Sequence, residues 1–318
     1  MLIVRTAAEL AEIEPARKGK RRGRRAVVMT MGALHEGHLA LVRAARESAD
    51  QVVVTVFVNP LQFDDAADLE RYPRDLDADV ALLDPLGVDV IYAPSVEDVY
   101  PGGRPIVTVS AGAMNDVFEG AHRPGHFDGV LTVVLKLMQL TRPDVAFFGQ
   151  KDAQQVIAIR TMCRDLNVPV EIAVVPTVRD EDGLALSSRN LRLSAAQRAD
   201  ALVLPRALAE AQQVLDEGGP LSLALTVMRA AFAEVPSVVP DYIGAMDPAS
   251  AQPVPDDYRG DVVLAVAARV GDTRLIDNVA TRVGPRATEA DASGEVPATE
   301  DDASGEVLAT EAPDASKG

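Results

Sequence analysis

Two histidines three residues apart stand where an apolar run of the sequence meets a predicted helix. The segment Met29-Thr-Met-Gly-Ala-Leu-His-Glu-Gly-His38 contains a glycine that permits a tight turn, and we expect the helix to begin around His35. At such a position the free backbone N–H groups and the positive end of the helix dipole attract an anion. The two imidazoles share one face of the first turn and can donate hydrogen bonds to phosphate oxygens. This segment therefore predicts a phosphate-binding site.

Other motifs that use histidine or bind nucleotides are excluded. A metalloprotease helix needs its two histidines four residues apart, and His35-Glu-Gly-His38 is one residue too short. The chain has neither a Walker lysine loop nor a Gly-x-Gly-x-x-Gly fingerprint. The segment resembles instead the His-x-Gly-His signature of adenylating nucleotidyltransferases. Taken alone, the motif leaves a pair of structural histidines as the alternative.

A second candidate site lies in Phe147–Gln155, again where an apolar run meets a predicted helix. Gly149 lets a ligand approach the backbone, and Lys151 is a compact cation for a phosphate. Asp152 suits a helix N-cap or a nucleotide hydroxyl, and Gln155 can donate to and accept from a hydroxy acid. The alternative for this segment alone is a capped helix with an exposed lysine.

A third candidate site is Asp182–Asn190, in which Ser187, Ser188 and Arg189 are consecutive. Two hydroxyls beside a guanidinium suit polyphosphate binding, because arginine offers a planar fork of donors. By itself this segment could also be an ordinary turn leading into a helix.

Two further segments carry polar side chains. Phe57–Phe63 ends a predicted strand and places the amides Asn59 and Gln62 at its carboxyl end, and Arg123–Phe127 offers a guanidinium and the imidazole of His126. All four histidines of the chain lie within the first segment or near this last one.

The elements that must position these residues alternate through the first 176 residues. Short apolar runs predict buried strands at Ala26–Met29, Val52–Val58, Asp89–Tyr92, Asp144–Phe148 and Val170–Val175. Helical periodicity fills the intervals at Leu39–Ala49, Leu76–Leu86, Gly129–Leu140 and Ala153–Leu166. This alternation predicts βαβ units and a Rossmann-like, doubly wound parallel sheet, which binds ligands beyond the carboxyl ends of its strands.

After Pro176 the pattern changes to that of a smaller α+β domain. Helices are expected at Ser194–Glu217 and Leu221–Phe232, followed by antiparallel strands at Asp241–Ala245, Asp261–Ala267 and Thr273–Asn278. We therefore divide the chain into an N-terminal domain (1–176), a small lid domain (177–283) and a disordered acidic tail (284–318). The tail contains a ten-residue near-repeat, at 287–296 and 298–307, and has too few bulky apolar residues to offset its ordering entropy.

Composition excludes several classes of function. The net charge of −17 and the absence of tryptophan disfavour nucleic-acid binding, although residues 287–318, with nine acids and one lysine, account for −8 of that charge. No apolar run approaches the length of a membrane span, and no signal peptide is expected. The single cysteine, Cys163, reads as a core residue in a reducing compartment, so we expect a cytoplasmic protein. The basic run Lys18–Arg25 is interpreted as a solvated loop, with a patch for nucleic acid or an acidic partner as the alternative.

Together the segments resemble the pantothenate synthetase (pantoate–β-alanine ligase) family over roughly residues 1–282. The resemblance rests on five ordered motifs: TMGALHEGH, FVNPLQF, RPGHFDGVLTVV, FFGQKDAQQ and DGLALSSRN. One motif would be weak, whereas five in the same order make coincidence improbable. Three positions depart from the family pattern: Met29 replaces proline, Gln150 replaces glutamate and Leu186 replaces methionine.

The resemblance implies a set of site residues. His38, His35, Lys151 and Arg189 would be catalytic, with His38 as the family's proton donor. The ATP-binding residues would be Met31, Gly32, Ala33, Leu34, His35, Glu36, Gly37, His38, Gly149, Gln150, Lys151, Asp152, Val178, Leu186, Ser187, Ser188 and Arg189. The substrate residues would be Gln62, Gln155, Asn59, His126 and Arg123, with Tyr72 as a further contact and Asp79 near a metal.

The resemblance also implies the reaction. The family condenses pantoate with β-alanine, using ATP and Mg²⁺, through a pantoyl-adenylate, and its members are commonly homodimers. The part bearing Ser187–Arg189 is expected to act as a lid that excludes water from the adenylate. Two alternatives stay open at this point: a nucleotidyltransferase for a phosphorylated, pantetheine-like substrate, and a nucleotide-binding regulatory protein without activity.

Overall fold

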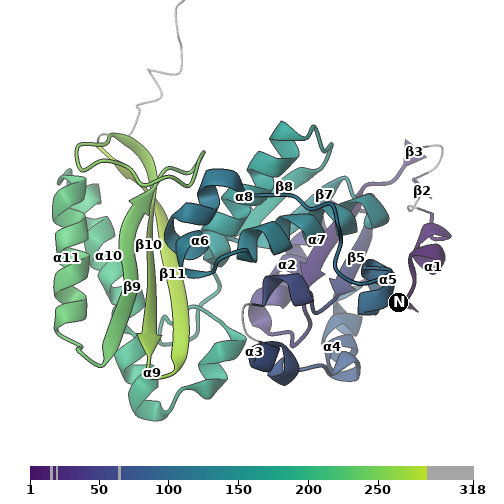
Figure 1. Ribbon diagram of the computed structural model, residues 1–318, viewed down its shortest axis with the longest axis horizontal. Helices are drawn as coiled ribbons and strands as arrows, with labels where there is room; N and C mark the ends of the chain where they lie inside the picture. Colours follow the sequence, from purple (N-terminus) through teal and green to yellow (C-terminus); the bar gives the residue numbers. More distant parts are fainter. Residues whose placement is uncertain (15–16, 19–20, 64–65, 285–318) are drawn as a thin grey trace, which may run out of the picture. The chain divides into compact units, whose positions relative to one another are not determined.

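The computed structural model describes residues 1–14, 17–18, 21–63 and 66–284. Its centre is a six-stranded parallel sheet with the order β1-β6-β5-β4-β7-β8 (Figure 1). The strands are β1 (Leu2–Val4), β4 (Arg25–Thr30), β5 (Gln51–Val56), β6 (Val90–Tyr92), β7 (Val145–Gly149) and β8 (Glu171–Val175). The central strands are rich in valine and buried on both faces, which is the pattern of a sheet covered by helices on both sides.

Helices cover the two faces of this sheet separately. Val27 and Val53 point to one face, where they pack with α7 and α8, whereas Val28 and Val54 point to the other, where they pack with α2 and α4. The helices before and between the strands are α1 (Ala7–Ala11), α2 (Glu36–Ser48), α3 (Ala66–Arg71), α4 (Leu76–Leu83), α5 (Val96–Val99), α6 (Phe118–His122), α7 (His126–Thr141) and α8 (Ala153–Asp165). Because successive strand residues face opposite sides, one valine run supplies both cores.

The strand order reverses between β4 and β7. From β4 the chain continues through β5 to β6 on one side, and from β7 to β8 on the other. A doubly wound sheet opens a crevice at such a reversal, beyond the carboxyl ends of the strands. Here the turn that follows β4 leads to the two histidines, and the short helix η4 (Gln150–Asp152) follows β7.

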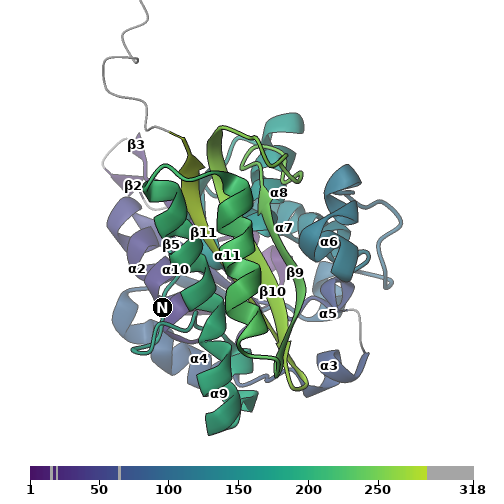
Figure 2. The same cartoon turned by 90° about the vertical axis from the view of Figure 1, so that its left-hand side faces the viewer.

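The C-terminal part contains a three-stranded antiparallel sheet, β11-β10-β9, covered by two helices (Figures 1 and 2). Its strands are β9 (Val238–Met246), β10 (Gly260–Val270) and β11 (Thr273–Val283). The helices α10 (Val203–Asp216) and α11 (Leu221–Ala233) bury apolar faces against the sheet. Between the two sheets the chain also forms α9 (Ala195–Ala201) and η5 (Ser188–Arg192).

The predicted fold class is confirmed, with local differences. The helix predicted at Ser194–Glu217 is two helices, α9 and α10, that meet at Leu202. Pro205 explains the break, because its ring would clash with the carbonyl of Ala201 in a continuous helix. The short strand β1 was missed: it lies at the edge of the sheet and exposes Leu2 and Ile3, so no buried run marks it.

The predicted division into domains stays a prediction. Residues 1–284 form one compact unit, and the predicted disordered tail, apart from its first residue, lies outside the described residues. The basic run Lys18–Arg25 falls partly outside them as well. Its last residue is not solvated: Arg25 is buried, and its guanidinium donates to Gln51 Oε1 and to the carbonyl oxygens of Thr141 and Ile13. Among the described residues, no helix has the length and apolarity needed to cross a membrane.

A half-buried ion network ties the small sheet to α6. The Arg274 guanidinium donates two hydrogen bonds of 2.7 Å to the carboxylate of Glu119 and one of 2.6 Å to Asp241. The three side chains keep only 10–19% of their surface exposed. Removing one member of such a network leaves buried charge without compensation, which costs far more than the loss of a surface ion pair.

We therefore predict that Arg274→Leu lowers the free energy of unfolding by about 3–5 kcal/mol. Arg206→Leu, which removes an exposed pair with Glu234, is the control and should cost no more than about 1 kcal/mol. Urea unfolding of both variants measures the difference. Equal losses would show that Arg274 contributes no more than a surface pair.

Candidate active site

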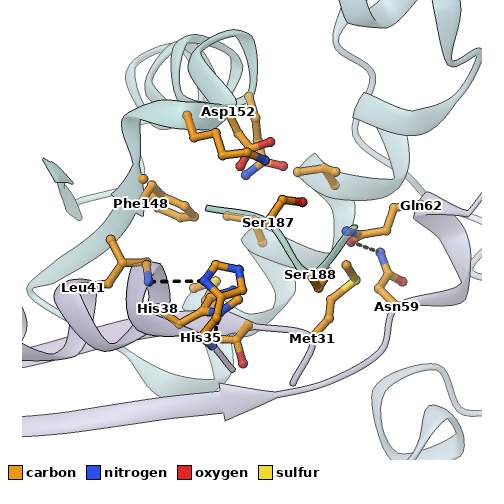
Figure 3. Close-up of a pocket in the computed structure, with 18 of the residues that line it drawn as sticks. Met31, His35, His38, Leu41, Asn59, Gln62, Phe148, Asp152, Ser187 and Ser188 are labelled. Atoms are coloured by element: carbon orange, nitrogen blue, oxygen red, sulfur yellow. Dashed lines mark hydrogen bonds between the residues drawn. The ribbon is translucent and has the colours of Figure 1, made fainter. Parts of the chain in front are cut away.

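A cavity of about 270 Å³ lies at the reversal of strand order, and most of the predicted site residues line it. They come from segments far apart in the sequence, as Figure 3 shows for Gln62, Asp152 and Ser187. The predicted residues that line it are Met31, His35, Gly37, His38, Asn59, Gln62, Tyr72, Arg123, His126, Gly149, Lys151, Asp152, Gln155, Val178, Leu186, Ser187, Ser188 and Arg189. The cavity also has an apolar lining for which no role was predicted: Val130, Val133, Val134 and Leu137 of α7, with Phe147 and Phe148 of β7.

Backbone amides fix the orientation of both histidines. His35 is the N-cap of α2, and its Nδ1 accepts a hydrogen bond of 3.2 Å from the Gly37 N–H. The Nδ1 of His38 accepts one of 3.3 Å from the His35 N–H. Since a backbone N–H can only donate, Nδ1 is the acceptor in each neutral ring and the proton resides on Nε2. Each imidazole therefore carries an Nε2–H donor.

Both histidines are held neutral. Burial lowers the pKa of His38 to about 3, with His35 as the next cause. Burial is also the main cause that lowers the pKa of His35, followed by the charge of Lys151. The ring centroids lie 4.2 Å apart, so a proton on one ring would oppose a proton on the other. The pair can offer hydrogen bonds to an anion without adding positive charge.

The turn between β4 and α2 is held by Asp79. Gly32 and Ala33 both have positive φ angles, of 79° and 52°, and for alanine such a conformation costs about 1–3 kcal/mol. The Asp79 carboxylate accepts from the N–H groups of Ala33, at 3.2 Å, and Leu34, at 2.9 Å. A hydrogen bond to a charged group contributes about 1.5–3 kcal/mol, enough to offset that strain. A side chain on Gly32 would lie 2.8 Å from this carboxylate, so the position needs glycine.

Strand β11 holds the loop that carries Lys151. The Asn278 side chain donates to the carbonyl oxygens of Gln150, at 3.1 Å, and Lys151, at 2.8 Å. Its neighbour Asp277 is buried and binds the guanidinium of Arg179 through both carboxylate oxygens, at 2.7 and 2.9 Å. Two adjacent residues of β11 thus hold the lysine loop and the start of the segment that leads to Ser187.

The serine-arginine segment is capped locally. Ser187 is the N-cap of η5, and its hydroxyl accepts from the Arg189 N–H at 3.2 Å. The side-chain amide of Asn190 donates to the Ala185 carbonyl oxygen at 3.0 Å and so stabilises the turn between these residues. Figure 3 shows Ser187 and Ser188 facing the cavity across from His35 and His38. The cavity is therefore lined by hydroxyls and a guanidinium as well as by imidazole donors.

The amides that were predicted to hold the acid lie at one end of the cavity. Asn59 donates to Gln62 Oε1 at 2.9 Å (Figure 3). Arg123 and His126 contact the Gln62 main chain: Arg123 Nη2 and His126 Nδ1 each lie 3.1 Å from its carbonyl oxygen. Both residues line the cavity, and their contacts hold the main chain of Gln62 in place. Their contact with the substrate stays a prediction.

Six predicted residues do not line the cavity: Gly32, Ala33, Leu34, Glu36, Gln150 and Asp79. Glu36 pairs with Arg43 on the surface of α2, and the Gln150 amide turns toward Asn278. Both oxygens of Asp79 accept backbone hydrogen bonds, so its structural role is to hold the turn; its assignment to a metal stays a prediction. The described residues contain no cluster of three or more histidine, cysteine, aspartate or glutamate side chains that could hold a metal ion.

Fold and site define a doubly wound α/β protein whose crevice brings together two imidazole donors, a lysine and an arginine, which are groups suited to an anionic ligand. A profile of the family described as pantoate-beta-alanine ligase matches residues 2–280. A pantothenate synthetase of Streptomyces avermitilis is 51% identical over 314 residues, covering 83% of this chain and 94% of its own. One of Thermobifida fusca is 51% identical over 285 residues, covering 87% and 95%.

Solved structures agree with these relatives. A pantothenate synthetase from Thermus thermophilus matches with a TM-score of 0.81 at 48% identity, covering 88% of this chain and 99% of its own. A pantoate-beta-alanine ligase from Francisella tularensis, complexed with beta-gamma ATP and beta-alanine, matches with a TM-score of 0.70 at 33% identity, covering 88% and 97%. The chain belongs to the pantoate–β-alanine ligase family and is a ligase.

The role of Asp79 can be tested by substitution. Asp79→Ala leaves the Ala33 and Leu34 N–H groups without this acceptor, so the turn that presents the histidines should loosen and kcat/KM should fall by at least about 10-fold. Asp79→Asn keeps one oxygen and should lose less. Asp77→Asn, on the exposed face of the same helix, is the control. Steady-state kinetics with equal activity in all three variants would contradict this role.

The low pKa of His38 should affect stability. Because it falls from 6.5 to about 3 on folding, the unfolded chain binds a proton in this range that the folded chain does not. The free energy of unfolding should therefore decrease as the pH falls below 6.5. His38→Gln should reduce this slope by up to about 1.4 kcal/mol per pH unit between about pH 4 and 6. Urea unfolding across this range measures it, and an unchanged slope would show that His38 is protonated in the folded state.

Proposed function

We propose that this ligase condenses pantoate with β-alanine at the expense of ATP, through a pantoyl-adenylate, with release of AMP and pyrophosphate. The observation that carries the proposal is one cavity lined by His35, His38, Lys151 and Arg189 together with Gln62 and Gln155. The first group suits a polyphosphate and the second a hydroxy acid. The Francisella relative, complexed with beta-gamma ATP and beta-alanine, supports the same ligands here.

The first step forms an acid anhydride. A pantoate carboxylate oxygen attacks the α-phosphorus of ATP, the bond to the bridging oxygen breaks, and pyrophosphate leaves with the negative charge that develops. Lys151 and Arg189 are cations at this place, and His35 and His38 add neutral N–H donors. Groups aimed at developing charge typically contribute about 10²–10³ in rate each. Removing the side chain of Lys151 or His38 should therefore reduce the rate of this step strongly.

The second step forms the amide. The neutral amine of β-alanine attacks the acyl carbon of the adenylate, the bond to the AMP oxygen breaks, and AMP leaves as the amine loses a proton. An acyl-adenylate is prone to hydrolysis, so the site must exclude water. The apolar lining from Val130 to Leu137 of α7 and from Phe147 and Phe148 suits this requirement. Movement of the Ser187–Arg189 segment as a lid stays a prediction.

Magnesium would enter mainly with the nucleotide. Mg²⁺ usually keeps several waters and binds through one or two carboxylates together with substrate phosphates. The described residues contain no cluster of three or more histidine, cysteine, aspartate or glutamate side chains that could hold the ion. When bound, the ion would neutralise phosphate charge. Among the described residues, Asp152 is the carboxylate that lines the cavity.

We also propose a cytoplasmic homodimer. The single cysteine, Cys163, is buried and free in the structure, which suits a reducing compartment. The dimer rests on the resemblance to the family, and the mass measured by light scattering tests it.

Lys151→Ala and His38→Ala should each reduce AMP formation by at least about 100-fold while the fold survives. Wild-type AMP formation should require ATP, pantoate and β-alanine together, which a coupled assay can follow. Arg160→Ala, at an exposed position of α8, is the control for the loss of a cation. Near-normal turnover of either site variant would refute the assignment, and AMP formation without pantoate would refute the proposed substrate.

A further inference from the structure

A buried tyrosine outside the cavity orders the amides at its substrate end. Tyr100 and Asn59 keep only 3% and 1% of their surface exposed. The Tyr100 hydroxyl donates to Asn59 Oδ1 at 2.9 Å. Tyr100 is not among the residues that line the cavity, whereas Asn59 and Gln62 are. The hydroxyl therefore reaches the cavity only through the two amides.

Backbone groups fix which way the Asn59 amide points. Its Oδ1 accepts from the Leu61 N–H at 3.2 Å, and its Nδ2 donates to the Gly129 carbonyl at 3.2 Å. A backbone N–H cannot accept and a backbone carbonyl cannot donate, so the two ends of the amide cannot be exchanged. With the Asn59 amide oriented in this way, its Oδ1 faces the Tyr100 hydroxyl. An amide oxygen can only accept, so the hydroxyl must donate to it. Burial raises the pKa of the Tyr100 hydroxyl, so it keeps the proton it needs.

The orientation of Asn59 fixes that of Gln62. Asn59 Nδ2 donates to Gln62 Oε1 at 2.9 Å, so the carbonyl end of the glutamine is engaged by this donor. Its Nε2, with two hydrogens, is the end left for a ligand (Figure 3). The main chain of Gln62 is held as well, by Arg123 and His126 at its carbonyl oxygen. Gln62 thus has little freedom to turn its amide over.

Close packing makes this arrangement possible. Helix α7 approaches the Asn59–Gln62 segment so closely that a side chain on Gly129 would lie 2.3 Å from the Leu61 carbonyl oxygen. This approach brings the Gly129 carbonyl within reach of Asn59. The Tyr100 ring packs edge to face with the ring of Phe57. The Lys136 ammonium lies 5.6 Å from the centre of the Tyr100 ring.

We propose that Tyr100 is a positioning residue that, through Asn59, holds the Gln62 amide with its N–H groups toward the acid substrate. A donor at this place suits an anionic carboxylate and a hydroxyl, whereas a reversed amide would present a carbonyl oxygen to the carboxylate. Tyr100 thereby favours a hydroxy acid over a ligand that needs an acceptor there. The inference rests on the proposed function, because it takes Gln62 as a contact of pantoate.

The test uses Tyr100→Phe, which removes only the hydroxyl. Loss of one buried hydrogen bond should raise KM and Kd for pantoate by about 3- to 10-fold while KM for ATP stays unchanged. Tyr92→Phe is the matched control: Tyr92 is buried in the same core, and its hydroxyl has no hydrogen-bond partner in the described part of the chain. This control should leave KM and Kd for pantoate and KM for ATP at their wild-type values.

A double-mutant cycle separates an effect through Gln62 from general damage. In a Gln62→Ala background, Tyr100→Phe should have no further effect on the Kd for pantoate, measured by calorimetry. The inference is overturned if Tyr100→Phe leaves pantoate binding unchanged, weakens ATP equally, or weakens pantoate by the same factor without Gln62. Wild-type protein that neither binds pantoate nor forms AMP with it would instead refute the proposed function.

Discussion

The active site depends on the reversal of strand order between β4 and β7. Because these two strands are neighbours and the chain leaves them in opposite directions, their carboxyl ends open into a crevice. The turn to α2 then brings both histidines, and η4 brings Lys151, to the same crevice. Strands β4 and β7 pair over only three residues, and this pairing brings together three catalytic candidates from two segments that lie more than 100 residues apart in the sequence.

In and beside that crevice, main-chain groups orient several of the polar side chains. Amide N–H groups fix both imidazoles, a pair of amides binds Asp79, and one amide with one carbonyl fixes Asn59. A backbone group cannot exchange donor for acceptor, so each contact selects one arrangement of its side chain. The cavity is therefore organised before a ligand arrives, which lowers the entropic cost of reaching the reactive geometry.

The parts of the site that the sequence predicted are those with local signals. The histidine turn, the lysine loop and the serine-arginine segment each join an apolar run to polar residues at fixed spacing, and the cavity contains residues of all three. The fold class followed from the alternation of runs and periodic segments.

What was missed depends on long-range contacts. Nothing near Tyr100 marks it as the partner of a residue 41 positions away, and Asn278 looks like any polar residue in a strand until β11 lies beside η4. Asp79 was assigned from resemblance to a place near a metal, although its contacts are with amides 45 and 46 residues earlier. Sequence spacing carries no information on such contacts, because tertiary packing alone creates them.

The adjacency of Asp277 and Asn278 has a consequence for how this protein can change. One residue binds Arg179 and the next binds the lysine loop, so a single short stretch of β11 serves two segments of the site. Exchanging the C-terminal part for that of a relative would alter both supports at once. A chimera should therefore preserve the geometry of the site only if β11 and the segments 149–152 and 178–189 come from the same parent protein. This holds even if the exchange is made at the boundary between the two sheets.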